Sequence, residues 1–88
     1  MYKGGITTDT YTTTKDRLLY LLEKNNLSIH ALALRSGVAP STIKNILYGK
    51  SKNPGIVTLK MLCDGFGISL TQFFDTDAFA STEPEDIG

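Results

Sequence analysis

The sequence predicts an all-α fold, a compact bundle of five short helices. Apolar residues recur three and four positions apart through most of the 88 residues, and this spacing places them on one face of a helix. Glycine, asparagine or proline separates the successive periodic segments, as these residues do where helices begin and end. No segment shows the alternation typical of a strand. Because 41% of the residues are apolar, a single domain of this length can bury one core.

The first helix is expected over residues 14–25, after a mobile N-terminal arm at residues 1–12 that is rich in threonine and glycine. Thr13 with Asp16 three residues later resembles a capping box, the reciprocal hydrogen-bond pair that starts many helices. Asn25–Asn26 ends the helix, because asparagine tolerates the left-handed conformation. The expected apolar stripe consists of Leu18, Leu21 and Leu22.

The second helix is expected over residues 29–36, with Ser28 as its N-cap and Gly37 as its end. A proline is favoured at the first helical position, so a third helix is expected from Pro40 to Tyr48. The residues of these two helices that we expect to be buried are Ile29, Leu32, Ala33, Ile43 and Ile46.

A turn-rich loop, GKSKNPG, leads to a fourth helix over residues 56–66. Its buried stripe is expected to consist of Ile56, Leu59, Leu62, Cys63 and Phe66. Ser69 and Gln72 form a capping box for a fifth helix over residues 70–75. Residues 80–88, ASTEPEDIG, are polar and acidic, and we expect a disordered tail there. The folded domain is therefore expected to span residues 13–79.

The net charge of zero hides a segregation of charge along the chain. Residues 26–61 carry five basic side chains and no acidic one, namely Arg35, Lys44, Lys50, Lys52 and Lys60. Residues 62–88 carry six acidic side chains and no basic one, namely Asp64, Asp75, Asp77, Glu83, Glu85 and Asp86. This asymmetry indicates an anion-binding middle part and an acidic C-terminal part.

Two short helices joined by a turn that contains glycine form a helix-turn-helix unit. Ala33 is small where the two helices cross, and Gly37 can adopt a positive φ without the steric penalty of a Cβ. Ile43 and Ile46 bury one face of the third helix. The opposite face is therefore left to Ser41, Lys44, Asn45 and Tyr48.

These features lie in the stretches LSIHALALRSGVAPSTIKNILYGKSKNP and TLKMLCDGFGISLTQFF. From Leu18 to Phe74 the chain resembles the lambda-repressor-like (XRE, Cro/repressor) helix-turn-helix family. The resemblance implies a sequence-specific transcriptional regulator, a repressor, whose third helix lies in the major groove of double-stranded DNA. The base-reading residues that it implies are Pro40, Ser41, Lys44 and Asn45. The DNA-backbone contacts that it implies are Ser28, Thr42, Tyr48, Lys50, Lys52, Asn53 and Thr58.

Two departures from the family pattern bear on this interpretation. Ile29 stands where many members have a glutamine that bonds DNA. Leu22 and Leu47 stand where some phage repressors have a buried arginine–glutamate pair, and an apolar pair of similar volume is commonly at least as stable. The alternative interpretation is a protein-interaction module of the same fold, such as an antitoxin or a partner-dependent regulator, with weak or no DNA binding of its own. Pro40, Ile29 and the acidic tail favour it, whereas the acid-free middle part opposes it.

A single reading helix covers only a few base pairs, too little to find one site in a genome. The resemblance therefore implies a homodimer on an inverted-repeat operator. The C-terminal region is the expected dimer contact, because Phe73, Phe74 and Phe79 offer more aromatic surface than a short terminal helix can bury. Phe74 and Phe79 are expected to contact the second copy.

Other functions find little support in the sequence. No paired carboxylates, nucleophile–base set or phosphate loop is present, so we do not expect an enzyme, and we expect no cofactor. His30 is expected to be a surface side chain, and Cys63, the one cysteine, an inert core thiol without a metal site. No apolar run approaches the roughly 20 residues that span a bilayer, so a cytoplasmic protein without a membrane segment is expected.

Overall fold

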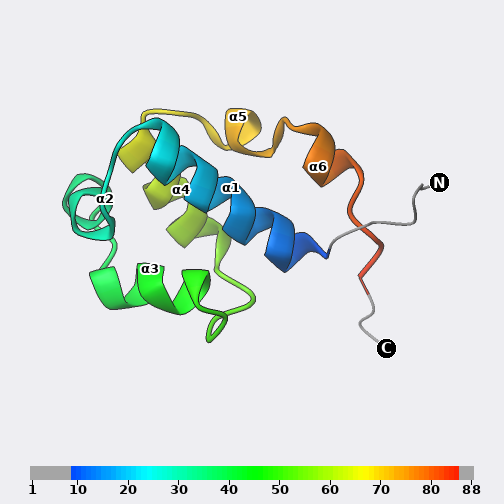
Figure 1. Cartoon of the computed structure of the whole chain (residues 1–88), viewed down its shortest axis with the longest axis horizontal. Coiled ribbons are helices and arrows are strands. Elements are labelled where there is room, and N and C mark those ends of the chain that lie inside the picture. The colour runs from blue at the N-terminus through cyan, green and yellow to red at the C-terminus, as the bar shows by residue number, and fades with distance from the viewer. Residues whose placement is uncertain (1–8, 86–88) are drawn as a thin grey trace.

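The structure, a computed structural model, describes residues 9–85. In that range the chain forms six helices: α1 Thr10–Lys24, α2 Ile29–Ser36, α3 Pro40–Leu47, α4 Ile56–Phe66, α5 Leu70–Phe74 and α6 Asp77–Ala80. Figure 1 shows α1 crossing the middle of the molecule, with α3 on one side of it and α5 and α6 on the other. The predicted all-α fold is confirmed, and α6 is added to the five expected helices.

The ends of the middle helices follow the predicted signals. The Ser28 hydroxyl accepts a hydrogen bond from the backbone N–H of Ala31 at 3.0 Å, which caps α2. Gly37 ends α2 with a φ of 77°, the left-handed conformation that glycine adopts most readily. Ser69 and Gln72 form the predicted capping box at the start of α5. Local hydrogen bonding thus sets each of these boundaries.

The predicted start of α1 is wrong. The helix begins at Thr10, and the carboxylate of Asp9 caps it by accepting the Thr12 N–H at 2.7 Å. Thr13 lies inside the helix and its hydroxyl donates to the Asp9 carbonyl, so no capping box forms between Thr13 and Asp16. Aspartate is the stronger N-cap, which explains the earlier start. Residues 1–8 of the expected arm lie outside the described residues, and the division into arm, domain and tail stays a prediction.

The sixth helix begins after Thr76, whose hydroxyl accepts a hydrogen bond from the Phe79 N–H at 3.3 Å. This segment packs against α1, and its Phe79 contacts Phe73 and Phe74 of α5 (Figure 1). Arg17 of α1 secures the end of α5, because its guanidinium donates to the carbonyl oxygens of Gln72 and Phe73, each at 2.9 Å. These carbonyls are at the C-terminal end of α5, where a cation is favoured.

The core lies between the first five helices, α1 to α5. Its largest fully buried side chains are Phe73, Leu18, Leu32, Ile43, Ile46, Leu62 and Cys63. The predicted burial of Ile56 is wrong, since 59% of its surface is exposed. Ile56 is the first residue of α4, whereas α4 approaches α2 closely near its other end. There a Cβ on Gly65 would lie 2.9 Å from the Cβ of Ser36, so glycine permits the close crossing.

Candidate nucleic-acid interface

One face of α3 is fixed against the core, and this determines what the other face presents. Ile43, Ile46 and Leu47 are buried against α1 and α2. The polar side chains predicted to face outward are all exposed: Ser41, Lys44, Asn45 and Tyr48. Thr42, one of the predicted backbone contacts, is also exposed. Pro40 is half-buried at the first position of the helix. The structure therefore brings the four predicted base-reading residues together on one short helix.

The C-terminal end of α3 is held by hydrogen bonds from outside the helix. The hydroxyl of Tyr11, in the first turn of α1, donates to the carbonyl oxygen of Ile46 at 2.6 Å. The N–H of Ser51 donates to the carbonyl oxygen of Asn45 at 2.9 Å. Both carbonyls would otherwise lack an intrahelical partner. The sequence reasoning missed Tyr11 because it assigned this residue to the mobile arm.

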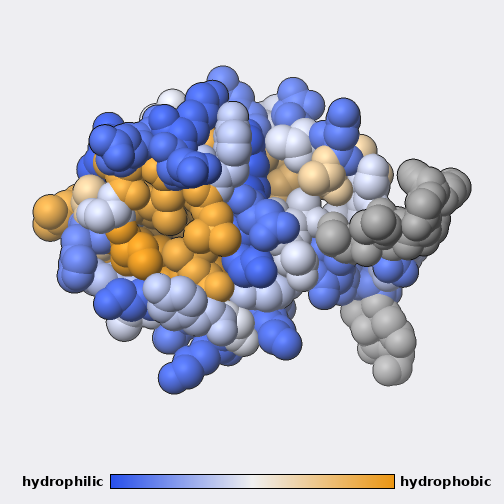
Figure 2. Space-filling view, in the orientation of Figure 1, coloured by the Kyte–Doolittle hydropathy of each residue, from blue (hydrophilic) through white to orange (hydrophobic). Residues whose placement is uncertain are grey.

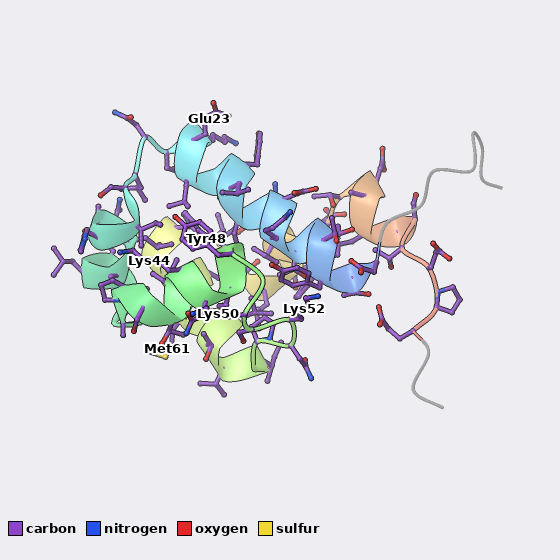
Figure 3. All side chains as sticks on the ribbon, turned by 60° about the horizontal axis from the view of Figure 1, so that its bottom comes forward. Glu23, Lys44, Tyr48, Lys50, Lys52 and Met61 are labelled. Atoms are coloured by element: carbon purple, nitrogen blue, oxygen red, sulfur yellow. The ribbon has the colours of Figure 1, made fainter. Side chains whose placement is uncertain are left out.

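The basic side chains on this side of the molecule are largely unpaired. Figure 3 shows Lys44 and Tyr48 projecting from α3, and Lys50 and Lys52 from the loop that follows. In the part of the chain that the structure describes, no ion pair involves Lys44 or Lys50. Lys60, by contrast, pairs with Asp64 one turn later on α4. Lys44 and Lys50 are thus available to an anion from outside.

Lys52 and Asn53 have a different environment. They line a hollow of about 580 Å³ together with Asp9 and Glu85, next to the start of α1. Hydrogen bonds from Thr12 hold the pKa of Asp9 below its usual value, and the positive charge of Lys52 lowers this pKa further. The carboxylate of Asp9 thus already interacts with the charge of Lys52.

Two helix N-termini near the basic residues have no side-chain cap. Ala39 precedes α3 and Gly55 precedes α4, and neither residue can supply a capping oxygen from its side chain. Thr58 lies half-buried in the first turn of α4. Uncapped helix N-termini present N–H groups and a positive dipole end, which favour an anion. At α2, by contrast, Ser28 occupies the capping position.

The aromatic residues expected at a dimer contact pack inside the chain. The ring centroids of Phe73 and Phe74 are 5.0 Å apart, and those of Phe74 and Phe79 are 4.9 Å apart, both pairs being edge to face. Phe73 is fully buried, and Phe74 and Phe79 are half-buried. The three rings thus cover one another in part, with Phe79 supplied by the unforeseen α6, and the expected dimer contact through Phe74 and Phe79 stays a prediction.

Apolar surface is exposed away from the phenylalanines of α5 and α6. Figure 2 shows an apolar area over α2 and the neighbouring parts of α1 and α3, surrounded by polar residues. Leu27 and Ile29, at the start of α2, are only partly buried against the core. Among the described residues, the most exposed large hydrophobic side chains are Leu34 of α2, Tyr48 after α3 and Val57 of α4.

His30 and Cys63, the remaining candidates, do not form a catalytic or metal-binding group within the described residues. His30 is exposed on α2. Cys63 is buried in the core, and this burial, followed by the charge of Asp64, raises the pKa of its thiol, so it reacts slowly as a nucleophile. Residues 9–85 contain no group of three or more side chains that could hold a metal ion. Over the same residues, every helix is too short or too polar to cross a bilayer.

Comparisons with known proteins agree with this geometry. The sequence model of a helix-turn-helix family matches residues 18–73. The solved structure described as "Crystal structure of the prophage Lp1 protein 11" is similar to this chain, with a TM-score of 0.72 and 30% sequence identity. The similarity covers 83% of this chain and 96% of that one. No curated protein sequence matches. The family match begins at Leu18, so it leaves out the start of α1, including Tyr11, and all of α6.

Proposed function

The chain belongs to the lambda-repressor-like (XRE) helix-turn-helix family of DNA-binding transcription regulators, and from this membership we propose that α3 reads operator bases in the major groove. The observation that carries the proposal is the exposed face of α3. It presents hydrogen-bonding and cationic side chains, with no acidic residue anywhere between positions 26 and 61. Such a face is complementary to base edges flanked by phosphates.

Each base-reading residue has a chemical role in this proposal. The amide of Asn45 pairs with the N6 and N7 atoms of adenine through two hydrogen bonds, and Lys44 donates to the acceptors of guanine. Ser41 bonds either a base or a phosphate. Pro40 offers only an apolar surface, which suits the methyl group of thymine.

Backbone contacts surround the reading helix in the same proposal. Lys50 is the strongest candidate, because it is exposed, forms no ion pair within residues 9–85 and lies in the loop shortly after α3. The uncapped N-termini of α3 and α4 supply further N–H donors for phosphates. The remaining proposed backbone contacts are Ser28, Thr42, Tyr48, Lys52, Asn53 and Thr58.

We further propose that the protein acts as a cytoplasmic repressor that binds an inverted-repeat operator as a homodimer. A domain that occupies an operator excludes other proteins from the same DNA, so binding alone suffices to repress. Two copies double the length of DNA that is read. The proposed contact remains the C-terminal region, where Phe74 and Phe79 each leave part of the ring uncovered.

Selection of bound sequences from a random duplex library tests the proposal. The expected product is an inverted repeat whose half-site centres lie about 34–36 Å apart. Affinity for random duplex DNA should also fall steeply as salt rises, because bound phosphates release counterions. Absence of binding even at low salt would reject the proposal and favour the protein-interaction module. Selection of a single half-site by one copy would reject the dimer alone.

A further inference from the structure

The hollow beside the start of α1 brings together three parts of the chain that are far apart in sequence. Its polar wall comes from Asp9 and Thr10, from Lys52 and Asn53, and from Glu85 near the C-terminal end. Figure 3 shows Lys52 next to the first turn of α1, on the loop that follows α3. A proposed DNA-backbone lysine therefore shares its surroundings with two carboxylates.

Glu85 makes a defined contact there. Its Oε2 atom accepts a hydrogen bond from the backbone N–H of Thr10 at 3.3 Å. Thr10 is the first residue of α1, so this carboxylate lies at the positive end of a helix of 15 residues. Asp9 already binds the N–H of Thr12, and Glu85 takes a second of the N–H groups that have no partner within the helix.

The negative charge of Glu85 would repel a DNA phosphate that binds beside Lys52. If Lys52 and Asn53 approach the DNA backbone, the phosphate beside them lies at the hollow that Glu85 also lines. Salt screens charges strongly only beyond roughly 8 Å at physiological ionic strength, so charges gathered at one hollow still act on one another. The carboxylate would repel that phosphate while attracting Lys52. DNA and Glu85 therefore compete for the same positive surface.

We propose that the C-terminal segment, residues 81–85, is an autoinhibitory strap whose Glu85 carboxylate occupies the place of a DNA phosphate beside Lys52. Non-specific DNA must displace this carboxylate or tolerate its charge. Operator DNA meets the same opposition, so the strap weakens specific and non-specific binding by about the same factor. Contacts to the correct operator bases supply additional free energy, so operator DNA stays bound under conditions in which non-specific DNA is released. This inference rests on the proposed DNA-binding function.

The Glu85→Gln variant tests the proposal, because glutamine keeps an acceptor for the Thr10 N–H and removes only the charge. Asp75→Asn is the matched control: it also removes one negative charge, and it lies between α5 and α6, across α1 from α3 (Figure 1). We expect E85Q to bind random duplex DNA about threefold more tightly at low salt, with the gain vanishing as salt rises. D75N should bind like the unchanged protein.

Equal affinities for E85Q and D75N would overturn the strap while leaving DNA binding intact. A complete lack of DNA binding in the unchanged protein and both variants would instead reject the proposed function, and the strap with it. Nuclear magnetic resonance tests the contact without DNA. The Thr10 amide resonance should shift in E85Q and stay in place in D75N, and an unmoved resonance in E85Q would also overturn the proposal.

Discussion

The hydroxyl of Tyr11 donates a hydrogen bond to the carbonyl oxygen of Ile46, and this bond ties the first turn of α1 to the last turn of α3. Tyr11→Phe removes the bond and leaves the ring. We expect the free energy of unfolding, measured in urea, to fall by about 1 kcal/mol. Tyr20→Phe is the control, because the Tyr20 hydroxyl is not hydrogen-bonded within residues 9–85, and its stability should not change. Equal stabilities of the two variants would contradict the role of this bond.

Asn45→Ala tests base reading. The variant should lose about 1–3 kcal/mol on the selected operator and discriminate less at one base pair, because a bidentate contact to one base is gone. Its affinity for random duplex DNA should stay nearly unchanged. A uniform loss over all sequences would show that Asn45 contacts the backbone instead.

Lys50→Ala tests the backbone contacts. The variant should bind every sequence more weakly, and the slope of log affinity against log salt should become shallower by about one unit. Lys60→Ala serves as the control, because Lys60 is paired with Asp64 and is not proposed to contact DNA. The same change of slope in both variants would point to net charge rather than to a contact made by Lys50.

Gly65→Ala tests the close crossing of α2 and α4. The added Cβ would meet the Cβ of Ser36 at 2.9 Å, so the helices must separate, and we expect a destabilisation of about 1–3 kcal/mol. Urea unfolding measures it. In a Ser36→Gly background the same substitution should cost less, because the opposing Cβ is absent. Part of the cost should remain, because the added Cβ would still lie 3.0 Å from the Cδ1 of Leu32 and 3.2 Å from the Cα of residue 36. An equal cost in both backgrounds would place the strain elsewhere.

Leu22 and Leu47 stand where some phage repressors have a buried arginine–glutamate pair, and alanine variants test whether the two leucines pack together instead. Both are buried, on helices that pack together. Leu22→Ala and Leu47→Ala should each destabilise the protein by about 2–5 kcal/mol. If the side chains contact each other, the double variant should lose less than the sum of the two single losses. Strict additivity would show that each packs against other residues.

The sequence predicted α2, α3 and α4 well because local signals decide them. Ser28 caps a helix, Gly37 and Gly67 end helices, and the apolar spacing identifies the buried faces. The exposed face of α3 followed from Ile43 and Ile46, since the residues opposite a buried stripe must face outward. Whether those residues read bases remains a prediction.

The wrong predictions share one cause, because each feature depends on contacts between segments that are far apart in the chain. The start of α1 is rich in threonine and has no apolar period, yet Tyr11 reaches the end of α3. Helix α6 is four residues long, and its Phe79 packs on Phe74. The exposure of Ile56 depends on where α2 crosses α4, and helical spacing contains no information about that position.

The attachment of α5 to Arg17 has a consequence for how the protein melts. A helix of five residues is far below the roughly 12–15 residues that an isolated helix needs in water, so α5 depends on its neighbours. Arg17 provides two of its terminal hydrogen bonds from the same helix whose first N–H binds Glu85. Unwinding the first half of α1 would therefore release α5 and α6 as well. We therefore expect the two ends of the domain to unfold as one cooperative unit, although Arg17 and Gln72 are 55 residues apart in the sequence.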